Sequence, residues 1–77
     1  MITGNVDKST YIAERRRALC MSQVRAAREA NVSLGTWLLW EREVGHPNAQ
    51  NIDSLARVLK VDKTELKAVL TRTGMLN

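Results

Sequence analysis

The sequence has no phenylalanine, one cysteine (Cys20) and one proline (Pro47) in 77 residues. A single cysteine excludes a framework of intrachain disulfides and suits a reducing compartment, so we expect a cytoplasmic protein. Wholly apolar runs reach only four residues, as in Trp37–Trp40, far below the roughly 20 residues that span a membrane. The first residues, MITGNVDKST, lack the apolar stretch of a secretory signal peptide, so we expect none.

The residue sets of common enzymes and metal sites are also missing. The only histidine, His46, and Cys20 cannot by themselves supply a nucleophile with its base or the ligands of a metal ion. No glycine-rich loop of the kind that cradles a phosphate occurs. We therefore expect no enzymatic activity, no catalytic residues, no metal and no cofactor.

Length and charge narrow the class of protein further. The chain is long enough for one small domain, and 12 Lys+Arg against 8 Asp+Glu give it a net charge of +4. This balance fits a nucleic acid, an anionic membrane surface or an acidic protein as partner. The charge is unevenly distributed along the chain. Residues 1–28 have six basic and two acidic side chains, whereas residues 29–47 have one basic and three acidic side chains.

Helix signals recur at short intervals, and no segment shows the alternation of a half-buried strand. Residues suited to a helix N-cap precede the apolar stretches, at Ser9 or Thr10, Ser22, Ser33, Asn48 and Asp62. The pattern predicts an all-α fold of five short helices. The first four are expected over residues 9–19, 22–30, 33–43 and 48–59, and the fifth after a capping box over residues 62–65.

Residues 22–41, SQVRAAREANVSLGTWLLWE, carry the most informative pattern. Two short helices joined by three or four residues are typical of a helix-turn-helix, whose second helix enters the DNA major groove. Ala27 is small enough for the helices to cross closely, and Asn31 tolerates the left-handed conformation of a tight turn. The spacing of Trp37 and Trp40 favours core positions over the alternative of base-stacking platforms.

This pattern resembles the Cro/lambda-repressor (xenobiotic-response-element) family over residues 11–70 without a gap. The matching positions are Arg16, Ser22-Gln23, Ala27, Val32-Ser33, Glu41, Pro47, the stripe Ile52, Leu55, Ala56 and Leu59, and Val61 with Leu66. The resemblance implies a compact five-helix lambda-repressor-like DNA-binding domain over residues 9–71. Its second and third helices would form the helix-turn-helix.

Three positions depart from the family pattern, which usually has leucine at position 26 and glycine at positions 31 and 43. Asn31 is a mild change for a turn. Ala26 removes core volume that the two tryptophans can refill. Glu43 adds negative charge beside the expected DNA-facing surface.

The resemblance also implies roles for single residues. Arg16 and Glu41 are expected to form a partly buried structural ion pair between the first and third helices. The expected DNA-phosphate contacts are Gln23, Arg42, His46, Asn48 and Asn51. The expected base-reading face of the third helix consists of Ser33, Leu34, Gly35, Thr36, Leu38 and Leu39.

That face is unexpectedly apolar, which leaves two hypotheses open. In the first, Leu34 and Leu39 pack on thymine methyl groups, Gly35 permits close approach, and Ser33, Thr36 and Arg42 supply the polar contacts. In the second, Leu34, Leu38 and Leu39 bind a protein partner, as in an antirepressor or an antitoxin.

The leading prediction is a bacterial or phage transcriptional regulator that binds double-stranded DNA sequence-specifically in the cytoplasm, at the nucleoid. We expect a repressor that acts as a homodimer on an inverted-repeat operator, with recognition helices about 34 Å apart. A nonspecific architectural DNA binder is a further alternative, weakened by the modest charge. Residues 1–8 are expected to be flexible, and the tail over residues 72–77 to contribute to a dimer contact. The candidate contact residues are Val69, Leu70, Met75 and Leu76.

Overall fold

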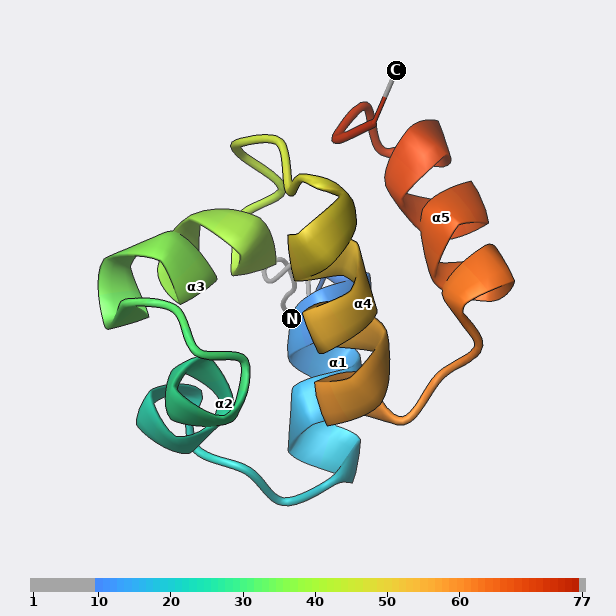
Figure 1. Cartoon of the computed structure of the whole chain (residues 1–77). Helices are drawn as coiled ribbons and strands as arrows, with labels where there is room; N and C mark the ends of the chain where they lie inside the picture. The colour runs from blue at the N-terminus through green and yellow to red at the C-terminus, as the bar shows by residue number, and fades with distance from the viewer. Residues whose placement is uncertain (1–9, 77) are drawn as a thin grey trace, which may run out of the picture.

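The computed structural model describes residues 10–76, which contain five α-helices and no strand. The helices are α1 (Tyr11–Ala18), α2 (Gln23–Glu29), α3 (Leu34–Glu41), α4 (Ala49–Leu59) and α5 (Lys63–Arg72). Helices α1 and α4 pack together at the centre, with α2 and α3 on one side and α5 on the other (Figure 1). The expected all-helical fold with five helices is therefore confirmed.

Every helix begins at a polar residue that the sequence had indicated. The N-caps are Thr10, Ser22, Ser33, Asn48 and Asp62, and each side chain accepts a hydrogen bond from a backbone N–H in the first turn. These bonds satisfy N–H groups that have no partner within the helix. Local chemistry therefore accounts for where each helix starts.

The reciprocal capping box lies at a different helix from the one expected. At α4, Asn48 and Asn51 each accept a hydrogen bond from the other's backbone N–H. At α5, Asp62 caps the helix, but the Glu65 carboxylate accepts a bond from the Tyr11 hydroxyl at 3.3 Å. Glu65 thus links α5 to α1.

Four non-glycine residues in the left-handed conformation follow helices α1 to α4. They are Cys20, Asn31, Glu43 and Lys60, with φ angles between 56° and 62°. This conformation ends a helix sharply, although it is sterically unfavourable for residues with a side chain. It explains why α3 ends at Glu41 rather than at the predicted residue 43.

The core is built around Trp37, which is fully buried, and Trp40, which is 3% exposed. Their rings meet edge to face with centroids 6.0 Å apart. Ala26, Ala27 and Ala30 of α2 are buried in the same cluster. The expected core role of both tryptophans is confirmed, and small residues on α2 leave room for their volume.

Two of the four residues expected at a dimer contact, Leu70 and Met75, lie in the core of the single chain, and the dimer contact itself stays a prediction. Each is only 1% exposed within the single chain. After α5 the chain reverses at Gly74, and the Met75 N–H donates to the Leu70 carbonyl. This reversal places the Met75 side chain in the core, whereas Val69 and Leu76 stay partly exposed. The expected flexible segment over residues 1–8 lies outside the described residues.

None of the helices within residues 10–76 combines the length and apolarity required to cross a membrane. The same part of the chain contains no group of three histidine, cysteine, aspartate or glutamate side chains placed to hold a metal ion.

The left-handed residues give a ranked stability prediction. Lys60→Gly is expected to raise the free energy of unfolding by about 1 kcal/mol, because glycine adopts this conformation without the steric cost that lysine bears. Asn31→Gly is expected to raise it less, since asparagine tolerates the conformation better. Urea denaturation of both variants checks the ranking, and an equal or reversed order would contradict this explanation of the helix ends.

Candidate functional site

Helices α2 and α3 form a closely packed pair joined by residues 30–33. Ala30 ends α2, Asn31 turns the chain in the left-handed conformation, and Ser33 caps α3. The Val32 N–H donates to the Ala27 carbonyl at 3.0 Å, which ties the turn back to α2. The turn and the buried alanines hold the two helices at close range.

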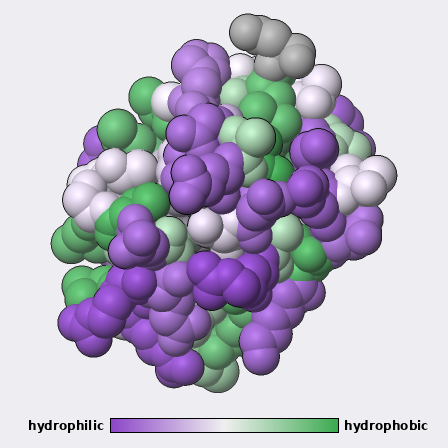
Figure 2. Space-filling model, in the orientation of Figure 1, coloured by the Kyte–Doolittle hydropathy of each residue, from purple (hydrophilic) through white to green (hydrophobic). Residues whose placement is uncertain are grey.

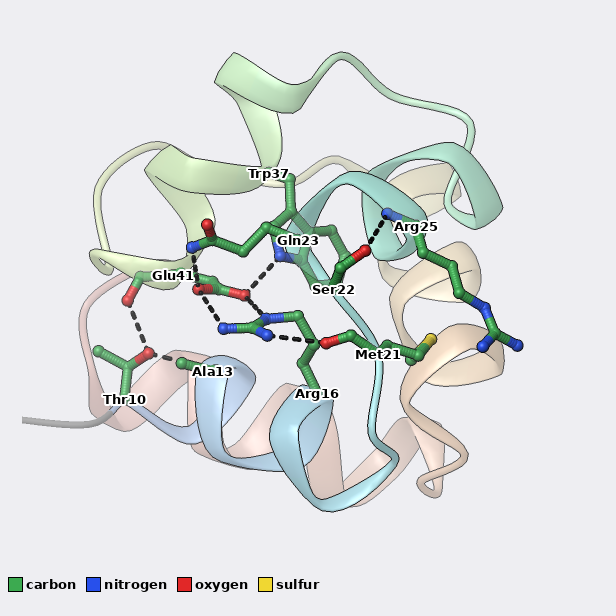
Figure 3. Close-up of polar contacts among 9 residues, drawn as sticks. All are labelled: Thr10, Ala13, Arg16, Met21, Ser22, Gln23, Arg25, Trp37 and Glu41. Carbon is green, nitrogen blue, oxygen red and sulfur yellow. Dashed lines mark hydrogen bonds and ion pairs between the residues drawn. The ribbon is translucent and has the colours of Figure 1, made fainter.

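The Glu41 carboxylate at the end of α3 is the centre of a buried polar network (Figure 3). It forms an ion pair with Arg16 of α1, whose side chain is 10% exposed, and accepts bonds from Trp37 Nε1 and from Gln23 Nε2. Arg16 also donates to the Met21 carbonyl at 2.8 Å. The structure thus brings Arg16 and Glu41 together as expected, and the network joins three helices.

These contacts hold Glu41 in its ionised form. Burial by itself raises the pKa of the Glu41 carboxyl, but hydrogen bonds from Arg16, Gln23 and Trp37, with the charge of Arg16, outweigh burial. The pKa of Glu41 therefore lies below its ordinary value. A carboxylate held in this way cannot serve as a free surface charge.

Gln23 takes part in this network, although the resemblance implied only a phosphate contact. Its side-chain N–H₂ group donates to Glu41 Oε1 at 3.0 Å, and the residue is partly buried as the first residue of α2. One of its two N–H donors is used in this way. A phosphate contact through the other donor stays a prediction.

The opposite side of α3 is exposed and largely apolar. Leu34 and Leu39 are 41% and 43% exposed, Gly35 is exposed, and Leu38 is partly buried. Residues 34, 35, 38, 39 and 42 share one helix face because each has another member of the set three or four positions away. We call Leu34, Gly35, Leu38, Leu39 and Arg42 the outer face of α3. Hydrophobic surface shows along the left-hand edge of Figure 2, where Figure 1 places α2 and α3.

The two hydroxyl groups expected on this face bond to each other. Ser33 Oγ donates to Thr36 Oγ1 at 3.0 Å and accepts from the Thr36 backbone N–H at 3.1 Å. Ser33 is exposed and Thr36 is partly buried. Ser33 therefore caps α3, and the Thr36 hydroxyl is bonded to the Ser33 hydroxyl. Arg42 is the charged residue of the outer face.

The other predicted phosphate contacts lie between the end of α3 and the first turn of α4. Arg42 is the exposed C-cap of α3, and the Nδ1 atom of His46 lies 3.1 Å from the Met75 carbonyl. Asn48 and Asn51 cap α4. These residues all lie within positions 42–51 of the chain. The exposed carboxylate of Glu43 lies within the same segment and adds a negative charge to it.

Two further apolar residues that the sequence pattern did not predict as exposed are Val24 and Val44, which are 50% and 52% exposed. Val24 lies on α2 beside an open hollow of about 420 Å³. The hollow is lined by Val24, Ala27, Arg28, Asn31, Val32, Ser33 and Leu34. A helical projection of α2 places Val24 on the side opposite the buried Ala26, and this placement is the signal that identifies Val24 as exposed.

Comparison of the chain with protein-family models, with curated proteins and with solved structures gives no match in any of the three.

Loss of the Glu41 charge is expected to destabilise the fold. Glu41→Gln leaves the buried Arg16 guanidinium without its counter-ion, so the free energy of unfolding at pH 7 should fall by about 3–5 kcal/mol. The matched control is Glu43→Gln, which alters an exposed carboxylate two residues away and should change stability by less than about 0.5 kcal/mol. Similar urea midpoints for the two variants would show that the network is not a major source of stability.

The lowered pKa of Glu41 also predicts how this difference depends on pH. A carboxyl whose pKa is lower in the folded state stabilises the fold fully above its unfolded pKa of about 4.3. That stabilisation is lost as the pH falls through the folded pKa. The stability difference between the wild type and Glu41→Gln should therefore shrink on acidification. A difference for Glu41→Gln that does not change with pH would contradict this assignment.

Proposed function

We propose that α2 and α3 form a helix-turn-helix and that this chain is a sequence-specific regulator that binds double-stranded DNA through the outer face of α3. In this proposal it acts as a repressor, as a homodimer on an inverted-repeat operator. The observation that carries the proposal is the two-sided character of α3. Its inner side is held by Trp37, Trp40 and Glu41, and its outer face is left exposed.

The connection between the two helices supports the proposal. A four-residue turn with one left-handed residue and small residues at the helix contact are the features that a helix-turn-helix requires. The N-terminal turn of α3, which contains Leu34 and Gly35, is exposed. In helix-turn-helix proteins this is the part of the recognition helix that contacts base edges.

The placement of charge supports a polyanionic partner. Arg28 lines the hollow beside the first turn of α3, and Arg42 caps the far end of the helix. An apolar strip between two cations suits a groove whose base edges lie between two phosphate backbones.

A second candidate function is a protein-interaction module, and the exposure of Leu34 and Leu39 favours it. Large exposed side chains of this kind are common at protein interfaces. Leu39→Ser separates the two functions. A changed base preference supports the DNA-binding regulator, and an unchanged preference with loss of a protein complex supports the interaction module.

Selection of binding sites from a random duplex DNA library at near-physiological salt tests the proposed function. We expect enrichment of an inverted repeat with half-sites one helical turn apart, about 10 base pairs. Enrichment of a single half-site would support sequence-specific DNA recognition but would contradict binding as a homodimer. No enrichment with a folded sample would overturn the proposed function.

The salt dependence of binding gives a residue-level prediction. If Arg42 contacts a phosphate, Arg42→Gln should weaken binding to all sequences and lower the slope of log K against log salt by about 1. Lys67 is exposed in the middle of α5, which packs on α4, and is the control (Figure 1). Lys67→Gln should leave the slope unchanged, and an equal effect of both substitutions would argue against the proposed interface.

A further inference from the structure

The fold does not require a glycine at position 35 of the outer face. Gly35 lies in the second position of α3, and it is not among the residues with positive φ. A methyl group added there would meet only Ser33 Oγ, at 3.9 Å, which is an ordinary contact. Glycine in a helix costs about 0.5–1 kcal/mol relative to alanine. The protein therefore carries a less stable residue at an open position.

The surroundings of Gly35 are apolar. Leu34 precedes it, and Leu39 lies four residues later on the same face, with each leucine more than 40% exposed. Because glycine has no side chain, the helix backbone at Gly35 is uncovered between the side chains of Leu34 and Leu39. This lets another molecule approach the helix backbone closely.

The first turn of α3 offers few side-chain donors to a base. The hydroxyl groups of Ser33 and Thr36 bond to each other, and no amide or guanidinium group extends from residues 33–39. Donor and acceptor patterns on base edges are normally read by such groups. The apolar feature in the major groove is the C5-methyl group of thymine.

We propose that Leu34, Gly35 and Leu39 are specificity-determining residues that recognise thymine methyl groups, with Gly35 allowing the base edge to approach the helix. This inference rests on the proposed function. It names what the outer face reads, namely half-sites with thymines at set positions. Arg28 and Arg42, on either side of this surface, favour DNA over an apolar protein partner.

Replacement of single thymines by deoxyuridine in the selected site tests the proposal, because it removes only the methyl group. For the wild type we expect about fourfold weaker binding at each contacted thymine, the equivalent of about 0.8 kcal/mol for one buried methyl group. In Leu39→Ala, binding should weaken and the difference between thymine and uracil should vanish at one of these positions. The matched control Val44→Ala removes an equally exposed apolar side chain outside the helix and should keep every difference.

Gly35→Ala adds an independent measurement. The variant should be more stable than the wild type, with a Tm higher by about 4 °C, yet should bind the selected site about tenfold more weakly. Lower affinity in a more stable protein cannot result from unfolding.

Three results would overturn the inference: wild-type binding that is insensitive to uracil at every thymine, a thymine–uracil difference that survives in both Leu34→Ala and Leu39→Ala, or undiminished binding by Gly35→Ala. In each of these cases specific DNA binding, and with it the proposed function, would stand. Absence of any selected sequence would overturn both.

Discussion

A buried carboxylate needs a full set of partners, and at Glu41 this need determines how three helices meet. Arg16 comes from α1, Gln23 from the start of α2 and Trp37 from α3 itself. The Glu41 backbone carbonyl also accepts a bond from the Thr10 hydroxyl that caps α1. Because an unpaired charge at this depth is costly, the helices cannot shift far relative to one another without breaking the network.

This constraint explains how a helix of only eight residues can have two different faces. The inner side of α3 is fixed by Glu41 and by the two tryptophans, which fill the volume that three buried alanines on α2 leave open. Leu34, Gly35 and Leu39 of the outer face are therefore exposed in the single chain and do not belong to the core.

The features that were predicted correctly from the sequence depend on local interactions. The N-caps form between residues two or three positions apart, and the inward position of the tryptophans follows from helical spacing. The link between Arg16 and Glu41 spans 25 positions, and only the family resemblance indicated it.

The features that were missed depend on how distant segments fold back. The apolar character of Met75 suggested a surface contact, but the chain reversal at Gly74 buries it against α5. The donation from Gln23 to Glu41 arises only once α2 and α3 have packed, and no local pattern marks it. For the proposed DNA-binding surface, the sequence predicted the outer face of α3, and the structure adds that Ser33 and Thr36 bond to each other.

In the proposed function, a rigid frame around Glu41 presents the outer face of α3 to DNA. The most direct measurement is an NMR titration of the ¹⁵N-labelled protein with its selected duplex, followed through the backbone amides. The account predicts the largest shifts at residues 33–35, 38, 39 and 42, with small shifts along α5. Shifts concentrated on α5, or spread evenly over the chain, would contradict it.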